Sequence, residues 1–225
     1  MLKNFKLKSL ILVLFISLCT IFSACGTGNK DYSVNLKETD IASISLFAYS
    51  GKGESHYGLI NLGHAFISID NTSSEDLVIY NFTIPAGETV TIGTWCINKH
   101  MGVWFNIESN YFVNYNKYDG RYSITTGIGR EDIETINNFI SSHDKWGVLK
   151  NCSYFALSLW NEIAEDSEHI DENPIFTPAY LEEEISKFDN HEINRPIKTD
   201  SSCYYYDNDK FYEFHFEGDN RYENN

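Results

Sequence analysis

Apolar and polar residues alternate in short stretches along the first half of the chain, a pattern typical of β-strands. In residues 63–70 (GHAFISID) the alternation places His64, Phe66 and Ser68 on one face and the apolar residues between them on the other. Short segments rich in glycine, proline or asparagine separate the stretches and predict turns. We expect strands over residues 41–49, 63–70, 77–84, 89–95 and 103–107.

After Gly129 the apolar residues recur every three or four positions, which indicates helices that pack by one face. We expect helices over residues 132–140, from Asn151 onward, and over residues 180–188. Two aromatic stretches, residues 203–206 and 211–216, flank a polar turn and predict a hairpin. The pattern predicts one α+β domain over residues 41–225, with several antiparallel strands and about three helices.

The N-terminus has the layout of a secretory signal. Three lysines precede an apolar run over residues 10–22, which is too short for a comfortable membrane span. The end of this segment, IFSAC, resembles a lipobox, where a signal peptidase cuts before a cysteine that carries diacylglycerol. We expect a signal peptide over residues 1–24, a lipid on Cys25 and a polar tether over residues 25–40. The alternative is an ordinary signal peptide cut near Ala24.

The chain is strongly acidic, with a net charge of −15. Residues 1–24 hold three lysines and no acidic residue, so their removal would change the net charge to −18. This charge excludes nucleic-acid binding through neutralised phosphates and membrane binding through a basic patch. We therefore expect an extracytoplasmic domain that the lipid alone attaches to the cell membrane.

Three cysteines follow the tether, at positions 96, 152 and 203. They allow either one disulfide with a remaining thiol or three thiols, and their spacing does not decide between these states. No CxxC pair and no HExxH motif occurs, so we expect neither a metal nor a cofactor.

The sequence Asn151-Cys152-Ser153 stands at the start of a predicted helix. Asn151 is a good N-cap, which places Cys152 at the first helical position. The unpaired backbone N–H groups and the helix dipole there favour a thiolate and can also bind an oxyanion. His64 on its strand is the candidate general base. Taken alone, each residue is more often structural, Cys152 as a small buried side chain and His64 as a core histidine.

Several segments considered together resemble a known arrangement. They are residues 63–67 (GHAFI), 93–95 (GTW), 102–108 (GVWFNIE) and, between Trp146 and Asn161, the run NCSYFA. They are similar to the circularly permuted branch of the NlpC/P60 (papain-like) superfamily, in which the histidine strand precedes the cysteine helix. This chain has that order, with His64 first and Cys152 second, and the resemblance covers roughly residues 55–190.

The resemblance implies a small antiparallel sheet that bears His64 and packs against the helix that begins with Cys152. It also implies thiolate chemistry on an amide or ester, with Cys152 as nucleophile, His64 as general base and a third polar group that orients the imidazole. We assign the third position to Asn106, with Glu108 as the alternative. Other polar residues that could take this place are Asn81 and His100.

Two functions follow from this interpretation. The first is a membrane-anchored cysteine hydrolase (amidase or peptidase) or acyltransferase, with a cell-wall peptide or a lipid as substrate by analogy with the family. The second is a surface lipoprotein of the same fold that binds a partner without turnover. A disulfide at Cys152, or a large distance between Cys152 and His64, would favour the second.

Overall fold

A computed structural model describes residues 36–51, 63–172, 176–198, 202–207 and 210–215. All of these residues belong to one compact unit, Val34–Asn225. The last residues of the expected tether lie within the described part, where Lys37 forms a 2.7 Å ion pair with Glu165. Cys25 and the rest of the expected signal and tether lie outside the described residues.

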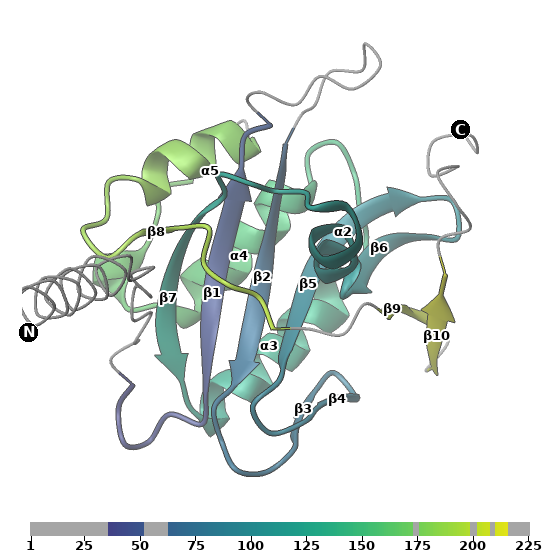
Figure 1. The fold of residues 1–225 in the computed structure, drawn as a ribbon, viewed down its shortest axis with the longest axis horizontal. Coiled ribbons are helices and arrows are strands. Elements are labelled where there is room, and N and C mark those ends of the chain that lie inside the picture. Colours follow the sequence, from purple (N-terminus) through teal and green to yellow (C-terminus); the bar gives the residue numbers. More distant parts are fainter. Residues whose placement is uncertain (1–35, 52–62, 173–175, 199–201, 208–209, 216–225) are drawn as a thin grey trace, which may run out of the picture. The chain divides into compact units, whose positions relative to one another are not determined.

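An eight-stranded antiparallel sheet is the main element of the fold (Figure 1). Its order is β10-β9-β6-β5-β2-β1-β7-β8. The strands are β1 Ala42–Tyr49, β2 His64–Asn71, β5 Thr89–Ile97, β6 His100–Phe105, β7 Tyr122–Ile128, β8 Glu192–Ile193, β9 Cys203–Asp207 and β10 Lys210–Phe214. The α+β class is confirmed, and so is the C-terminal hairpin, but the expectation of a small sheet is wrong. The sheet is larger because β7 and β8 extend one edge while β9 and β10 extend the other.

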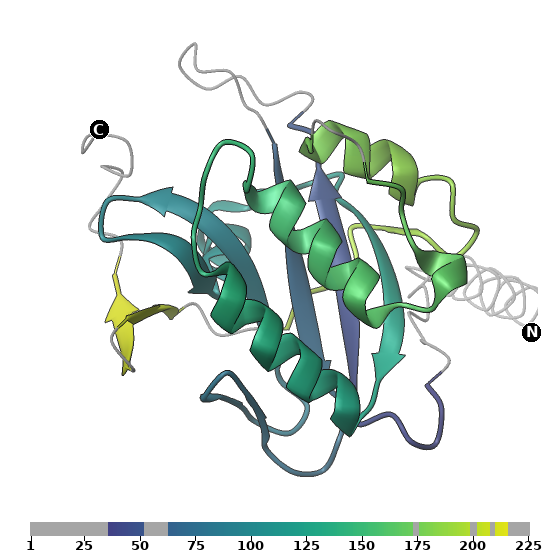
Figure 2. The same ribbon diagram turned by 180° about the vertical axis from the view of Figure 1, so that it is seen from behind.

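Helices cover both faces of this sheet (Figures 1 and 2). The helices α3 Arg130–His143, α4 Cys152–Ile163 and α5 Pro178–Ile185 lie on one face, and α2 Ile107–Tyr115 lies on the other. The described residues therefore hold four α-helices, besides a short 3-10 turn over Asp166–Glu168, where the apolar periodicity predicted about three.

The main hydrophobic core lies between the sheet and α3, α4 and α5. From the sheet, Ala65, Ile67 and Ile69 of β2 contribute the face that the alternation predicts to be apolar. From α4, Phe155 and Trp160 are fully buried against it. Each large apolar side chain so buried stabilises the fold by about 1.5–3 kcal/mol, which holds α4 firmly against the strand that bears His64.

Two expected strands differ from the structure. Residues 77–84 form a two-stranded hairpin, β3 Leu77–Ile79 and β4 Phe82–Ile84. The turn residues Tyr80 and Asn81 have φ of 48° and 66°, the left-handed pair that a tight hairpin with two turn residues requires. The strand expected over residues 103–107 ends at Phe105, because Asn106 has φ of 63° and the next residue begins α2.

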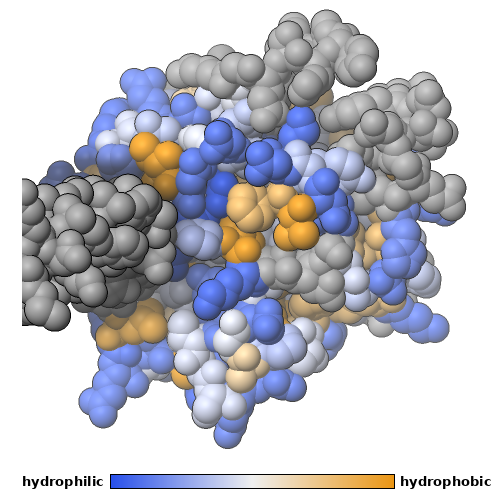
Figure 3. Space-filling view, viewed as in Figure 1, coloured by the Kyte–Doolittle hydropathy of each residue, from blue (hydrophilic) through white to orange (hydrophobic). Residues whose placement is uncertain are grey.

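The face of the molecule that carries α2 is mostly hydrophilic among the described residues, with small separate hydrophobic patches (Figure 3). This distribution agrees with the acidic, polar composition of the chain.

Candidate active site

Cys152 occupies the first position of α4, as its sequence predicts. The side-chain oxygen of Asn151 accepts a 3.0 Å hydrogen bond from the backbone N–H of Tyr154, which is an N-cap contact. The side-chain nitrogen of Asn151 donates to the carbonyl of Phe176 at 2.9 Å and so ties the cap to the chain before α5. The half-buried Cys152 thus lies where backbone N–H groups have no partner within the helix.

Strands β2 and β5 are not paired with each other at the position where Cys152 contacts β2. Strand β2 pairs with β1 as far as His64, but its pairing with β5 begins only at Ile67. The backbone N–H of Ala65 therefore remains available, and it hydrogen-bonds the Cys152 sulfur. The separation of the two strands admits the helix N-terminus beside the first residue of β2.

His64 is buried in an aromatic surrounding at the start of β2. The centroid of its ring lies 4.2 Å from that of Trp95, 5.9 Å from that of Phe66 and 6.0 Å from that of Tyr118. These contacts limit the rotation of the imidazole and exclude water from most of its surface.

The thiol and the imidazole influence each other's pKa. Burial by itself raises the pKa of Cys152, but the nearby imidazolium charge, its hydrogen bond and the N–H of Ala65 outweigh burial and lower it. Burial likewise lowers the pKa of His64, but the thiolate of Cys152 and the carboxylate of Glu108 outweigh burial and raise it to about 9. Opposite shifts of this kind favour a thiolate–imidazolium pair near neutral pH.

Glu108 is the carboxylate that holds the imidazole. Its Oε1 lies 2.8 Å from Nε2 of His64 and accepts a second hydrogen bond, 2.7 Å long, from the indole N–H of Trp95. The side chain is fully buried and stands in the first turn of α2, where the helix dipole favours a negative charge. Because Nε2 contacts Glu108, the other ring nitrogen of His64 is the one left for Cys152.

Gly93 leaves the space that the His64–Glu108 pair occupies. A Cβ atom at this position would lie 2.3 Å from Oε1 of Glu108 and 3.3 Å from Nε2 of His64. Gly93 and Trp95 thus form part of the site, although their sequence reveals no more than a strand. In the sequence, only their place in the segment GTW, one of those that resemble the permuted NlpC/P60 arrangement, indicated that they could belong to the site.

The expectation that Asn106 orients the imidazole is wrong in the structure. The side-chain oxygen of Asn106 accepts from the backbone N–H of Thr91 at 3.1 Å, and the backbone N–H of Asn106 donates to the carbonyl of Thr91 at 2.8 Å. The prediction placed Asn106 on a strand over residues 103–107, whereas Asn106 turns the chain into α2. This turn brings Glu108, the alternative, to His64.

The remaining options for this third position lie elsewhere. Asn81 stands in the turn between β3 and β4. His100 contacts Asp144 instead, with 2.7 Å between Nε2 and Oδ1, and its ring stacks on Tyr205.

The three cysteines of the described domain are all thiols. Cys96 is exposed, Cys152 is half-buried, and Cys203 is buried with its sulfur 3.5 Å from the carbonyl oxygen of Asn106. The disulfide that would have favoured a non-catalytic domain is therefore not formed. Within the described ranges, no cluster of histidine, cysteine and acidic side chains has the geometry to hold a metal ion.

Comparisons with protein-family models, with curated proteins and with solved structures found no match to this chain. Among the described residues, no helix has the length and apolar character needed to cross a membrane.

Proposed function

We propose that this protein is a membrane-anchored lipoprotein whose domain is a cysteine hydrolase (amidase or peptidase) or acyltransferase. The observation that carries the proposal is the chain of contacts from Cys152 through His64 to Glu108, with the opposite pKa shifts of thiol and imidazole. A nucleophile, a base and a buried group that orients the base form the arrangement that nucleophilic catalysis needs.

In the first half of the reaction, the thiolate of Cys152 attacks the carbonyl carbon of an amide or ester. A C–S bond forms, and the electron pair of the carbonyl moves to its oxygen, which the free N–H groups at the start of α4 stabilise. The oxyanion then collapses, the bond to the leaving amine or alcohol breaks, and the imidazolium of His64 supplies the proton that the leaving group takes.

In the second half, the neutral imidazole accepts a proton from the group that attacks the thioester. With water as acceptor the products are a carboxylic acid and the free thiolate, which is hydrolysis. With an amine or alcohol as acceptor the acyl group is transferred. The same three residues serve both reactions.

The place of His64 before Cys152 in the chain, together with the packing of α4 against β2, supports a fold of the permuted NlpC/P60 type. By analogy with that family, a cell-wall peptide or a lipid is the proposed substrate. Lipidation at Cys25 would keep the domain at the outer side of the membrane, where such substrates occur.

The proposal is tested by the rate at which iodoacetamide alkylates Cys152 as a function of pH. The full chain in detergent is used, peptide mass spectrometry follows each cysteine, and the exposed Cys96 is the internal reference. We expect a midpoint for Cys152 well below the value of about 8.5 of a free thiol, and a rise of this midpoint in His64→Ala. An unreactive Cys152, or identical labelling without His64, would instead support the non-catalytic binding protein.

A further inference from the structure

The loop between α3 and α4 carries the most exposed large apolar side chains of the described residues. Val148 is 80% exposed and Leu149 is 78% exposed, whereas the other exposed large apolar residues range from 38% to 54%. Single exposed apolar residues are ordinary on protein surfaces, but neighbouring ones that stand out in this way point to a contact surface. Figure 2 shows the loop near one end of the sheet, beside the start of α4, and the β3–β4 hairpin near the other end.

Backbone hydrogen bonds close this loop into a turn. The N–H of Gly147 donates to the carbonyl of Lys150 at 3.0 Å, and the two apolar residues form the tip between them. The N–H of Trp146 donates to the carbonyl of Met101 in β6, also at 3.0 Å. The loop is therefore attached to the sheet at its base, and the fold itself presents the two apolar side chains to the surroundings.

The residues on both sides of the tip have a composition that suits the surface of a bilayer. Lys145 and Lys150 are exposed and form no ion pair with a described residue, and Trp146 is half-buried at the base of the loop. Residues 145–151 contain no acidic residue, although the chain has 32, and the preceding Asp144 is hydrogen-bonded to β6. Lysine side chains extend to the lipid headgroups while apolar neighbours enter deeper, and tryptophan is enriched at the same level.

The proposed lipid on Cys25 keeps the domain close to a bilayer. The eleven residues at positions 26–36 connect Cys25 to the first described residue, and even fully extended they span at most about 40 Å. Such a tether raises the local concentration of the loop at the bilayer, so a contact too weak to hold the domain by itself can form. The net charge of −15 opposes the approach of the domain to an anionic surface, so the loop does not replace the lipid.

Resting on the proposed function and its lipid anchor, we propose that the loop over residues 145–150 docks into the surface of the bilayer. The side chains of Val148 and Leu149 enter the boundary between headgroups and acyl chains, and the two lysines contact lipid phosphates. Cys152 follows Leu149 by three residues. Docking therefore places the nucleophile near the level of the headgroups and presents it to acyl compounds that the bilayer holds.

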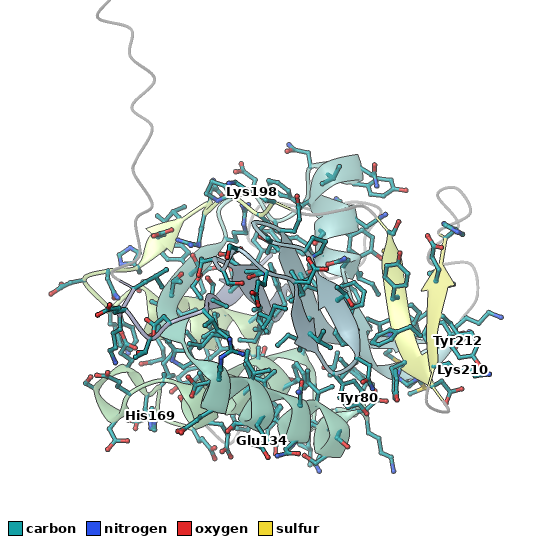
Figure 4. All side chains as sticks on the ribbon, turned by 90° about the horizontal axis from the view of Figure 1, so that it is seen from below. Tyr80, Glu134, His169, Lys198, Lys210 and Tyr212 are labelled. Atoms are coloured by element: carbon teal, nitrogen blue, oxygen red, sulfur yellow. The ribbon has the colours of Figure 1, made fainter. Side chains whose placement is uncertain are left out.

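Fluorescence quenching by brominated lipids tests the contact. The lipidated full chain is placed in vesicles of brominated phosphatidylcholine with a smaller amount of phosphatidylglycerol, and bromine quenches a tryptophan that touches the acyl chains. Leu149→Trp puts a probe at the tip of the loop. Val78→Trp is the matched control, because Val78 is 50% exposed in the β3–β4 hairpin, close to the turn residue Tyr80 (Figure 4). We expect the tryptophan added at position 149 to be quenched several-fold more than the one added at position 78.

A charge at the tip provides the second test. In the Leu149→Trp background, Val148→Asp puts a carboxylate where the proposal places the acyl chains. Transfer of this charge out of water is unfavourable, so we expect the quenching to fall to the level of Val78→Trp. Val113→Asp adds the same charge at a 54% exposed position of α2, on the other face of the sheet, and we expect it to leave the quenching unchanged.

Two results would overturn the docking loop. One is equal quenching of Leu149→Trp and Val78→Trp, which is also the result expected if a protein partner covers the tip instead. The other is quenching at position 149 that Val148→Asp and Val113→Asp reduce to the same extent, since the effect would then come from the added charge and not from its place at the tip.

Iodoacetamide labelling separates this proposal from the proposed function. The tip residues lie outside the proposed catalytic residues, so labelling of Cys152 in detergent should be the same in all these variants. Labelling that does not depend on His64 would overturn the proposed catalysis without changing the quenching. Mass spectrometry shows whether Cys25 carries the lipid, and a chain without it would overturn the anchor together with the loop contact that rests on it.

Discussion

Nε2 of His64 lies 2.8 Å from Oε1 of Glu108, although 44 residues separate them in the chain. His64 is the first residue of β2, and Glu108 lies in the first turn of α2, the helix that follows β6 in the chain. Trp95 donates to the same oxygen, and Gly93 leaves space for it. Under the proposed function, the reactivity of Cys152 therefore depends on the carboxylate of Glu108, which acts through His64.

Replacement of Glu108 by glutamine should lower the reactivity of Cys152. The amide retains the shape of the side chain but loses the charge that helps to raise the pKa of His64, so the imidazolium and the thiolate become less favoured. We expect a drop of about tenfold in the alkylation rate near neutral pH, because one pKa unit corresponds to that factor. The measurement is the pH profile of iodoacetamide labelling at Cys152.

Asn106→Ala is the matched comparison for Glu108→Gln. Its side-chain oxygen accepts a hydrogen bond from the backbone N–H of Thr91 in β5, and no hydrogen bond joins it to the imidazole. We expect a loss of stability of about 1–3 kcal/mol, visible in urea denaturation, because alanine leaves the buried backbone N–H of Thr91 without its partner. A shift of the labelling midpoint as large as that of Glu108→Gln would contradict this assignment.

The pH dependence of turnover should differ from that of alkylation. The imidazolium of His64 exists below its pKa of about 9 and is lost as the pH rises through that value. The thiolate of Cys152 exists above its lowered pKa and is lost as the pH falls through it. Catalysis requires both forms, so we expect a bell-shaped profile once a substrate is known.

Alkylation needs only the thiolate, so its rate should not decline above pH 9. A decline of alkylation in parallel with turnover would show that the fold, and not the imidazolium, is lost there. Circular dichroism over the same pH range distinguishes these two causes.

Gly93→Ala should disrupt the His64–Glu108 contact. The new Cβ would lie 2.3 Å from Oε1 of Glu108, so the carboxylate must move. Overpacking of this kind costs about 1–3 kcal/mol, and we expect slower alkylation of Cys152 together with a lower melting temperature. Gly147→Ala is the control, because a Cβ there meets no atom within 4 Å. Equal effects of the two variants would contradict the steric role of Gly93.

Cys25→Ser should release the protein from the membrane fraction. The lipid on Cys25 is the proposed attachment, and the net charge of −15 disfavours binding of the chain to an anionic membrane surface. Fractionation of cells that express the wild type and the variant measures the change. Retention of Cys25→Ser in the membrane fraction would favour a different mode of attachment.

The sequence by itself determined the start of the helix at Cys152 and the strand that bears His64, because both depend on residues that are close together in the chain. The cap at Asn151 and the periodicity after it predicted the position of Cys152, because a helix start requires only contacts within one turn. The alternation around His64 predicted its strand and the buried face between Ala65 and Ile69, because side chains of a strand alternate by geometry. These two predictions were enough to name the candidate nucleophile and the candidate base.

The tertiary structure alone decided which side chain meets the imidazole. Asn106 and Glu108 are both polar and lie two residues apart, and the choice depends on the left-handed backbone of Asn106, which ends β6 and starts α2. The same holds for the size of the sheet, since it arises when segments distant in the sequence pair. The order of apolar and polar residues indicates which secondary structure each segment prefers. The contacts between segments form only when all segments bury their apolar faces together.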